Sequence, residues 1–307
     1  MSYPKVSIIV LNWNGLSDTI ECLESLRKIT YTNYGVIVVD NGSDGDDARI
    51  LSEKYADYAH IIVNDKNYGY TGGNNIGMQY SRSHWQPDYH LILNNDTVVA
   101  PDFLNGMVET AESDADIGIV GPAIYNYDFP ERIIYGGGKL NMWTGKAGHI
   151  APHDESRDVD CVSGCCLLIK DTVAQKVGVL DESYFCYWDD IDYCVRVREA
   201  GFRVVYCSPS KIWHKVPAIV PWYRRLKGNN RLSVVPYKVY YGTRNHLKFM
   251  RKHASGVQYS SFLIYFFSWH LCLTTSAYLL LYRDSRLLMD FYTGIKDGLL
   301  GRTGARY

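Results

Sequence analysis

Short apolar runs alternate with amphipathic stretches through the first two hundred residues of the chain. The runs with the length of a β-strand lie at 6–11, 36–39, 60–63 and 89–93. Between them, residues 16–28 place apolar side chains at helical spacing, and residues 73–82 are predicted as a second helix. This alternation predicts an α/β fold in which a largely parallel sheet lies between helices.

The later residues continue this pattern. Helices are predicted at 101–113 and 188–200, and strands at 117–120, 159–169 and 203–207, with Pro209 ending the last strand. Residues 125–151 form an insertion rich in glycine and aromatic residues. Polar residues follow two of the early strands, as Asp40-Asn41-Gly42 and Asn94-Asn95-Asp96. Because ligands bind beyond the carboxyl ends of the strands in open α/β sheets, both turns point to one cleft.

Charge divides the 307-residue chain into two parts, although its net charge is only -1. Residues 1–214 carry 30 acidic and 17 basic side chains, whereas residues 215–307 carry 3 acidic and 15 basic ones. Residues 215–256 hold ten Lys or Arg and no Asp or Glu, and residues 257–282 hold none of the four. A basic segment that runs into an apolar one favours an anionic membrane surface as partner. Nucleic acid is the weaker alternative, since no nucleic-acid-binding motif accompanies the basic residues.

The apolar segment 257–282 leaves three alternatives open. It is long enough to span a bilayer, for which about 20 residues suffice. Seven Ser, Thr or His residues interrupt it, so a helix in the membrane interface and a helix packed on the rest of the protein also remain open. Residues 287–300 are predicted as an amphipathic helix with one apolar side, formed by Leu288, Phe291, Ile295 and Leu299.

We therefore expect three parts along the chain: an α/β domain at 1–214, a basic, membrane-facing segment at 215–256 and C-terminal helices at 257–307. The N-terminal apolar run 6–11 is too short for a signal peptide, which predicts a cytoplasmic protein. None of the eight cysteines forms a Cys-x-x-Cys pair, so reduced, buried thiols are expected rather than zinc ligands or disulfides. With the basic segment, this places the protein at the cytoplasmic face of the membrane.

The segment Asn94-Asn95-Asp96 combines a carboxylate and two amides at a predicted strand end. Mg²⁺ and Mn²⁺ prefer oxygen ligands, so this segment suits a hydrated cation that holds a diphosphate. The alternative is a polar turn in which Asp96 caps the helix that opens near Pro101. His214 ends the last strand region, where a histidine is more often a packed residue than a ligand unless Asp96 lies close to it.

Three acids, Asp189, Asp190 and Asp192, follow Trp188 at the start of a predicted helix. Part of this acidity complements the positive end of the helix dipole. Adjacent like charges beneath aromatic cover also raise each other's pKa, which is a common way to make a general base. The segment is therefore a candidate base as well as a candidate helix start.

Residues 67–77 form a glycine-rich turn that opens a helix, where backbone N–H groups can approach a phosphate or a ribose. The turn is not a Gly-x-Gly-x-x-Gly motif after the first strand, and it lacks the Gly-Lys-Ser/Thr of a P-loop. These differences argue against a dinucleotide dehydrogenase and an NTPase. The three glycines at 136–138 lack P-loop spacing too, and a flexible turn is expected there.

Taken in order, five segments resemble glycosyltransferase family 2, the inverting nucleotide-sugar enzymes of GT-A fold, and especially its rhamnosyltransferase-like members. The segments lie at 6–15, 38–43, 67–77, 91–97 and 178–214. The resemblance spans about 6–214 and weakens after His214. It implies a GT-A fold, with a mixed, largely parallel sheet between helices and a C-terminal helical appendage.

The resemblance also implies a role for individual residues. Contacts to the nucleotide sugar are implied for Leu11, Asn12, Asp40, Asn74, Asn94 and Asn95. Asp96 matches the metal-binding acid of the family's Asp-x-Asp motif, and His214 resembles a second metal ligand. Asp190 matches the catalytic base, with Trp188 and Asp189 on the acceptor side.

The implied function is that of a metal-dependent inverting glycosyltransferase that uses Mg²⁺ or Mn²⁺. It would move a hexosyl or deoxyhexosyl group from dTDP-rhamnose, or from a UDP- or GDP-sugar, to a saccharide or lipid-linked acceptor in cell-surface glycan or glycolipid synthesis. A polyprenyl-phosphate sugar synthase, which has the same fold but uses a phosphate as nucleophile, is an alternative. Two departures from the family pattern, Asn94 for the first Asp and Asp189 for a Glu, suggest a second alternative, a catalytically silent nucleotide-sugar-binding scaffold.

Overall fold

The computed structural model describes residues 3–150, 153–215 and 235–306. The chain divides into two compact units. The first unit contains Met1–Lys139, Gly148–Glu182 and Asp189–Val216. The second contains Leu140–Ala147, Ser183–Trp188 and Pro217–Tyr307.

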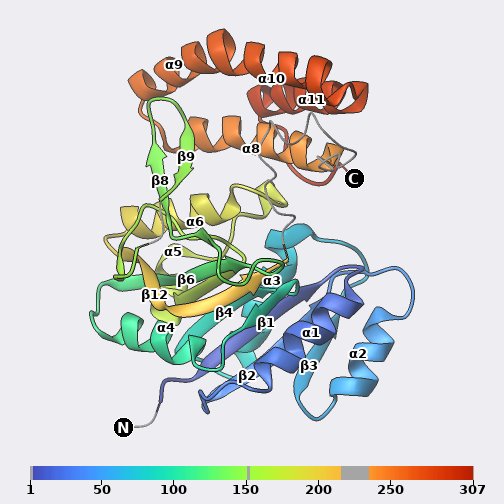
Figure 1. Cartoon of the computed structure of the whole chain (residues 1–307), viewed down its shortest axis with the longest axis vertical. Helices are drawn as coiled ribbons and strands as arrows, with labels where there is room; N and C mark the ends of the chain where they lie inside the picture. The colour runs from blue at the N-terminus through green and yellow to red at the C-terminus, as the bar shows by residue number, and fades with distance from the viewer. Residues whose placement is uncertain (1–2, 151–152, 216–234, 307) are drawn as a thin grey trace. The chain divides into compact units, whose positions relative to one another are not determined.

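A mixed sheet forms the centre of the first unit (Figure 1). Its strand order is β10-β12-β6-β11-β4-β1-β2-β3, with β5 beside β12 and β7 beside β6. The early strands are parallel: β1 (Val6–Asn12), β2 (Tyr34–Asp40), β3 (Ala59–Val63) and β4 (Tyr89–Asn94). The later strands are β5 (Thr97–Val99), β6 (Ile117–Asn126), β7 (Ile133–Tyr135), β10 (Arg157–Asp158), β11 (Cys166–Lys170) and β12 (Arg203–His214). The predicted α/β fold with a largely parallel sheet is confirmed.

Helices cover both faces of this sheet. They are α1 (Leu16–Leu26), α2 (Asp47–Tyr55), α3 (Gly69–His84), α4 (Phe103–Glu112), α5 (Asp171–Val177) and α6 (Asp189–Glu199), with a 3₁₀ turn at Glu182–Tyr184. The sequence predicted α1, α3, α4 and α6 to within a few residues at each end. It did not predict α2, a short and mostly polar helix whose buried residues are Leu51 and Tyr55.

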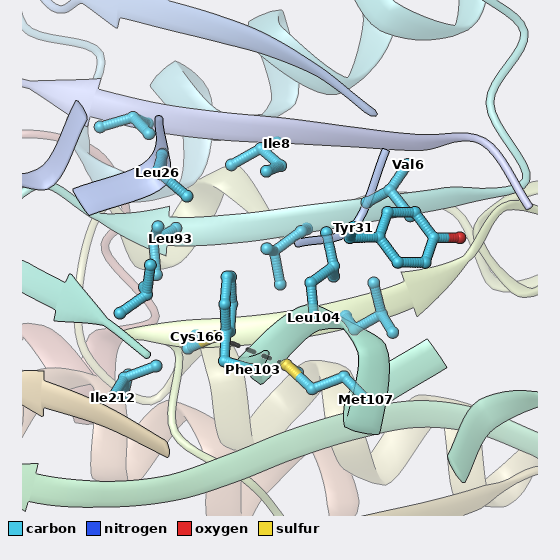
Figure 2. Close-up of a cluster of buried hydrophobic side chains, with 14 of the residues drawn as sticks. Val6, Ile8, Leu26, Tyr31, Leu93, Phe103, Leu104, Met107, Cys166 and Ile212 are labelled. Carbon is cyan, nitrogen blue, oxygen red and sulfur yellow. Dashed lines mark hydrogen bonds between the residues drawn. The ribbon is translucent and has the colours of Figure 1, made fainter. Parts of the chain in front are cut away.

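The strands alternate between the two faces, so neighbouring side chains face different helices. Figure 2 shows the core between the sheet and helices α1 and α4, where Ile8, Leu93 and Cys166 meet Phe103 and Met107. All five are at most 1% exposed, and burying each side chain of this size stabilises the fold by about 1.5–3 kcal/mol. The core holds the strands rigidly, and their carboxyl ends carry the polar turns described below.

Two strand predictions are wrong in their extent. In the region 159–169 the strand begins only at Cys166 and runs to Lys170, because the chain turns at Gly164 and Cys165 before β11 begins. Strand β12 does not stop at Pro209 but continues to His214, with a bulge between Cys207 and Lys211. Proline is tolerated at such a bulge because the ladder hydrogen bonds are interrupted there anyway.

The glycine-rich insertion 125–151 is more ordered than expected. It contains the end of β6, strand β7 and a hairpin of β8 (Gly138–Asn141) and β9 (Lys146–His149). Gly137, expected in a flexible turn, has a φ of 99° and a Cβ there would lie 2.5 Å from Val159. Only glycine fits this close approach, so Gly137 serves the packing of the first unit.

The second unit contains the tip of the β8–β9 hairpin and, in the described residues after 234, consists mainly of helices. Its helices are α8 (Pro236–His253), α9 (Gly256–Tyr265), α10 (Leu271–Ala277) and α11 (Ser285–Leu300), with π turns at Phe266–His270 and Tyr278–Tyr282. Helix α9 begins with a capping box between Ser255 and Gln258. The run Gly256–Leu280 is one continuous helix of 25 residues and is long and apolar enough to cross a membrane.

Helix α11 is confirmed as a helix, but its buried side matches the predicted one only in part. Phe291 and Ile295 are buried, whereas Leu299 is 43% exposed. The contact side includes Gly294 and Gly298, where a Cβ would lie within 3 Å of backbone oxygens of α8. The two helices approach closely along these glycines, which a search for apolar side chains cannot detect.

Candidate active site

The carboxyl ends of three neighbouring strands lie at one edge of the sheet. In the parallel register Asn12 of β1 pairs with Asp40 of β2, and Leu11 pairs with Asn94 of β4. The residues predicted to contact a nucleotide sugar are therefore brought together at this edge, with the exception of Asn74. This is the location that open α/β sheets use for ligands.

A chain of hydrogen bonds joins these strand ends. The Asn95 side-chain amide donates to the Thr19 hydroxyl (2.9 Å), which donates to Asn12 Oδ1 (2.7 Å). Asn12 Nδ2 in turn donates to Asp40 Oδ2 (2.7 Å), and Ser43 donates to the same carboxylate through its hydroxyl (2.7 Å) and its backbone N–H (3.0 Å). Asp40 is only 1% exposed. Its first task is to hold the turn after β2; its contact with a base stays a prediction.

The glycine-rich segment 67–77 is mostly helix rather than turn, because α3 already begins at Gly69. Its glycines allow α3 to lie directly on the sheet: a Cβ at Gly73 would lie 2.3 Å from Leu11 Cδ1. Asn74 is fully buried within α3 and donates to the Tyr70 carbonyl (2.8 Å). Its Oδ1 is buried without a hydrogen-bond partner. Asn74 thus lies on α3 and not at a strand end, and its contact with a nucleotide sugar stays a prediction.

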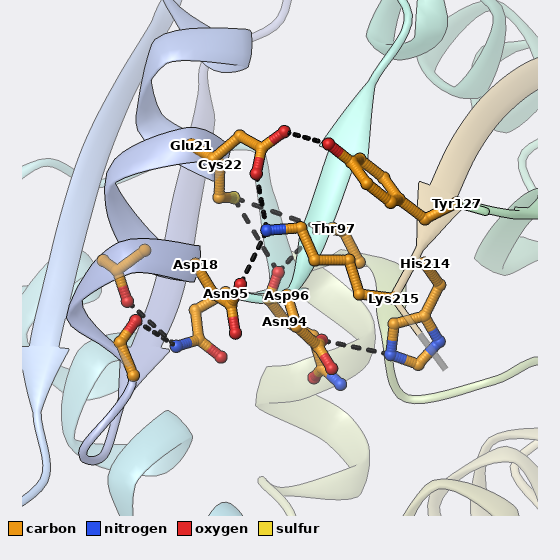
Figure 3. Close-up of polar contacts among 12 residues, drawn as sticks. Asp18, Glu21, Cys22, Asn94, Asn95, Asp96, Thr97, Tyr127, His214 and Lys215 are labelled. Atoms are coloured by element: carbon orange, nitrogen blue, oxygen red, sulfur yellow. Dashed lines mark hydrogen bonds and ion pairs between the residues drawn. The ribbon is translucent and has the colours of Figure 1, made fainter. Parts of the chain in front are cut away.

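Asp96 and His214 are brought together by the pairing of two strands. Thr97 of β5 pairs with His214 of β12, and this register places His214 Nε2 at 3.0 Å from Asp96 Oδ1 (Figure 3). The condition under which His214 becomes a candidate ligand is thus met. The capping alternative for Asp96 is wrong, because β5 follows it and Asp102 is the N-cap of α4.

The two groups stabilise each other as an ion pair. Burial by itself lowers the pKa of His214, but Cys165 and Asp96 outweigh burial and raise the pKa to about 10. Burial likewise opposes ionisation of Asp96, yet His214 lowers the pKa of this carboxyl overall. Asp96 Oδ1 is buried and lacks a well-aligned hydrogen bond, so it retains a lone pair for a cation.

Asp96 and His214 fit a divalent cation as a pair of ligands once the cation displaces the imidazole proton, because histidine binds a metal only in its neutral form. In the described part of the chain no group of three or more His, Cys, Asp or Glu side chains is placed to hold a metal ion. Mg²⁺ and Mn²⁺ take six ligands and are commonly bound by one or two protein groups together with phosphate and water oxygens. Two ligands at this position therefore suit a cation that arrives with a diphosphate.

A second charged cluster beside this pair was not predicted. Lys215 Nζ lies 2.6 Å from both Asp18 Oδ1 and Glu21 Oε2, and Tyr127 donates to Glu21 Oε1 (2.5 Å) (Figure 3). The Lys215 backbone N–H also donates to the Asp96 carbonyl (3.0 Å). Lys215, counted with the basic segment in the sequence, thus pairs with α1 and supports the Asp96 turn.

The candidate base Asp190 lies in the first turn of α6. The Gly164 N–H donates to Asp190 Oδ2 and the Ile191 N–H to Oδ1, both at 2.9 Å. Burial raises the pKa of Asp190, and these two N–H groups oppose that rise without cancelling it. The carboxylate is thereby fixed in orientation and holds a proton more readily than an exposed Asp does, as a general base requires.

Gly164 also accepts a hydrogen bond from Tyr70, an aromatic residue of α3. Tyr70 of α3 donates to the Gly164 carbonyl (2.5 Å), and burial together with Asp189 and Asp190 raises the pKa of the Tyr70 phenol. A Cβ at Gly164 would lie 3.0 Å from the Tyr70 hydroxyl and 3.2 Å from Asp190 Cβ. Gly164 therefore belongs to the candidate site around Asp190. The sequence analysis missed it because it lies within an apolar run.

The next residue connects Asp190 to the Asp96–His214 pair. Cys165 accepts a hydrogen bond from the Asn94 N–H through its carbonyl (2.9 Å), and its thiol interacts with His214. Two consecutive residues thus contact the candidate base on one side and the candidate metal ligands on the other. No sequence signal marks Gly164 and Cys165, because their role depends on the neighbours that the fold supplies.

The two acceptor-side residues differ in their placement. Asp189 is 3% exposed and belongs to the first unit. Trp188 belongs to the second unit, where its ring stacks on His246 with a centroid distance of 4.4 Å. Their roles toward an acceptor stay predictions.

Comparisons with known proteins identify similar sequences. The chain matches the family model described as glycosyltransferase-like family 2 over residues 4–231. It is 27% identical over 221 residues to a low-salt glycan biosynthesis hexosyltransferase of Haloferax volcanii, covering 69% of this chain and 67% of that protein. It is 26% identical over 215 residues to an N-acetylglucosaminyl-diphospho-decaprenol L-rhamnosyltransferase of Mycobacterium tuberculosis, covering 62% of this chain and 70% of that protein.

A solved structure shares the fold. The crystal structure of GalNAc-T7 with UDP, GalNAc and Mn²⁺ superposes with a TM-score of 0.62 at 15% identity, over 89% of this chain and 58% of that one. At this identity the similarity establishes the architecture alone.

Proposed function

The chain belongs to glycosyltransferase family 2 and has the GT-A fold, and on this premise we propose that it is an inverting, cation-assisted glycosyltransferase with Asp190 as its base. One observation carries the proposal. The candidate base and the Asp96–His214 pair converge on the consecutive residues Gly164 and Cys165. An acid–base group and an anion-stabilising pair at one edge of the sheet are what transfer from a nucleoside diphosphate requires.

Asp190 takes the proton from the acceptor hydroxyl as its oxygen attacks the anomeric carbon. The new C–O bond forms while the bond to the diphosphate oxygen breaks, and the nucleoside diphosphate leaves with the electron pair. Attack from the face opposite the leaving group inverts the anomeric centre. The two N–H groups that hold the Asp190 carboxylate support this role, since they fix its oxygens before the acceptor arrives.

Asp96 and His214 would hold a divalent cation, with Asn94 and Asn95 beside them. Such a cation supplies electrostatic stabilisation for the negative charge that gathers on the leaving diphosphate. The Lys215–Asp18–Glu21 cluster fixes the backbone of Asp96 and so keeps its carboxylate beside His214. The Mn²⁺ in the GalNAc-T7 structure supports this assignment.

The acceptor that we propose is a lipid-linked saccharide. The Mycobacterium relative acts on an N-acetylglucosaminyl-diphospho-decaprenol. The second unit adds a suitable surface, because the helix Gly256–Leu280 exposes large apolar side chains, among them Ile264, Phe267, Trp269, Leu273 and Leu280. An apolar helix face of this kind, packed on the unit along its other side through Phe262 and Phe266, favours a helix lying in the membrane interface over a spanning one.

The basic segment 215–256 supports membrane binding less strongly than the exposed apolar side chains do. Of its ten Lys and Arg residues, those at 224, 225, 227 and 231 lie outside the described residues, as do Trp222 and Tyr223. Lys215 is paired with Asp18 and Glu21, and Arg244 is buried. Among the described residues of the segment, Lys238 and Arg251 are exposed cations that could attract anionic lipid.

Nucleotide release from a panel of UDP-, GDP- and dTDP-sugars tests the proposal. The purified full-length protein is assayed with a lipid extract as acceptor source, in Mn²⁺, in Mg²⁺ and in EDTA. We expect release from one donor class and its loss in EDTA. Nucleotide release that persists in EDTA would contradict the proposed role of a divalent cation. A product that is labile to mild acid would indicate a polyprenyl-phosphate sugar instead.

A further inference from the structure

The segment Ser183–Trp188 has a strained backbone immediately before the candidate base. Phe185, Tyr187 and Trp188 have φ values of 68°, 65° and 68°. The left-handed region is unfavourable for any bulky side chain, and here three aromatic residues out of four adopt it. Such a conformation persists only where the surrounding structure holds it, and it concentrates at functional sites.

Asn245 of α8 holds the carbonyls of this segment. Its Nδ2 lies 2.9 Å from the Tyr184 oxygen, 2.7 Å from the Cys186 oxygen and 2.9 Å from the Tyr187 oxygen. One side-chain amide thus shares its two N–H groups among three backbone carbonyls. Asn245 is 0% exposed, so these bonds form without competition from water.

Arg244 adds a second set of bonds from the same helix. Its Nη2 donates to the carbonyls of Tyr184 (2.8 Å) and Ser183 (3.3 Å), and its Nε donates to Asn245 Oδ1 (2.9 Å). The guanidinium is buried, with the residue 1% exposed. A buried charge is costly unless it is fully hydrogen-bonded. The Arg244 guanidinium meets this requirement through bonds that orient both the Asn245 amide and the segment Ser183–Trp188.

The rings of the strained residues are also held by α8. Phe185 stacks on Tyr241 with a centroid distance of 5.1 Å, and Trp188 stacks on His246 at 4.4 Å. Tyr187 stacks on Tyr237 at 6.4 Å. Each residue with a positive φ in this segment therefore has its ring fixed by one residue of α8, while Asn245 and Arg244 fix the carbonyls between them.

From these contacts we infer that Arg244 and Asn245 are positioning residues for sugar transfer. The peptide chain runs from Trp188 directly into Asp189 and Asp190, so the clamped segment is the covalent neighbour of the candidate base. The inference rests on the proposed role of Asp190. It gives the second unit a part in catalysis that is separate from any attachment to a membrane.

The substitution Asn245→Asp tests this most directly in the full-length protein. Asp has the same size and keeps an oxygen for Arg244 Nε, but it replaces the amide donor with an oxygen that faces three carbonyls. The matched control is Tyr292→Phe, which removes a hydrogen bond of the same unit to the Thr275 hydroxyl (2.9 Å) and leaves Asn245 and Arg244 unchanged. The assay uses whichever UDP-, GDP- or dTDP-sugar the wild type consumes.

We expect Asn245→Asp to lower kcat at least tenfold while the donor KM stays within twofold of the wild type. We expect Tyr292→Phe to change neither value by more than twofold. Amide hydrogen exchange at 183–190 should accelerate in Asn245→Asp alone. A merely structural role would instead lower the yield of folded protein without this split between kcat and KM. Where Asn245→Asp does not fold, Arg244→Lys takes its place with the same expected values.

A kcat within twofold of the wild type, with faster exchange at 183–190, would overturn the inference. The assay of Asp190→Asn beside it separates the two failures. If Asp190→Asn turns over normally, the proposed base is wrong whatever Asn245→Asp does. If Asp190→Asn is inactive and Asn245→Asp is normal, only the positioning role is wrong.

Discussion

At the scale of single residues, Gly164 is the point where the proposed site is most tightly packed. Its N–H holds the Asp190 carboxylate and its carbonyl accepts from Tyr70. It therefore orients the candidate base and the aromatic residue beside it at once. A side chain at this position has no free space on either side.

We predict that Gly164→Ala lowers kcat by about tenfold, since small displacements of a catalytic group are costly to the rate. The added Cβ, 3.0 Å from the Tyr70 hydroxyl and 3.2 Å from Asp190 Cβ, must push one of them aside. Steady-state kinetics of the purified variant check this. Gly148→Ala is the control, because its Cβ would meet nothing closer than 3.9 Å. Equal kcat for Gly164→Ala and the wild type would contradict the proposed geometry.

The sequence predicted the residues that carry charge better than the residues that hold them. Asp96, Asp190 and His214 are recognisable because few side chains supply their chemistry. Gly164 and Arg244 are not, since a glycine in an apolar run and an arginine in a basic segment have many ordinary uses. Their roles follow from contacts between segments distant in the chain, and no local pattern encodes those.

At the scale of elements, an ion-pair cluster joins α3, β4 and α5. Asp171 begins α5, and its Oδ1 lies 2.8 Å from both Arg82 Nη2 and His90 Nε2. Burial opposes ionisation, but His90, Gln175 and Arg82 outweigh it and hold the pKa of Asp171 well below its usual range. Because the folded-state pKa is depressed, this stabilisation is complete above about pH 4 and is lost as pH falls towards the folded-state value.

We predict that Asp171→Asn lowers the free energy of unfolding by about 2 kcal/mol at pH 7, because it leaves a buried partner uncompensated. Urea unfolding of wild type and variant measures the difference, which should shrink below about pH 4 as Asp171 becomes protonated in the wild type. Glu53→Gln, in an exposed pair with Arg49, is expected to leave the urea midpoint unchanged. A difference that grows as the pH falls would be inconsistent with this cluster.

Strand and helix boundaries were predictable where apolar periodicity is strong and unpredictable where backbone geometry decides. The parallel strands β1 to β4 emerged from their apolar runs alone. The continuation of β12 past Pro209 depends on a bulge, and the contact side of α11 depends on Gly294 and Gly298. Both features are backbone arrangements, to which a pattern of side-chain hydrophobicity is insensitive.

At the scale of the whole molecule, the chain joins an acidic GT-A unit to a helical unit with an exposed apolar surface. Ile264 and Leu280 are 70% and 71% exposed on the helix Gly256–Leu280. Exposed large apolar side chains gathered on one helix are typical of an interaction surface. The sequence identified this segment by composition, whereas its exposure required the structure.

We predict that Ile264→Gln combined with Leu280→Gln weakens binding to phosphatidylglycerol vesicles by at least about tenfold, because each apolar side chain contributes about 1.5–3 kcal/mol on burial in lipid. Flotation of the full-length protein with the vesicles provides the measurement. Val63→Gln, an equally large change at a residue of the first unit that is 60% exposed, should not alter flotation. Identical flotation of all three proteins would refute the membrane assignment.

The central claim is that Asp190 is the base of a glycosyltransferase reaction. The most direct measurement is the rate of sugar transfer by Asp190→Asn beside the wild type, with binding of the donor's nucleoside diphosphate in Mn²⁺ measured by calorimetry on both. The account predicts a loss of turnover of at least about 100-fold with nucleotide affinity unchanged. A variant that retains more than half of the wild-type turnover would contradict it.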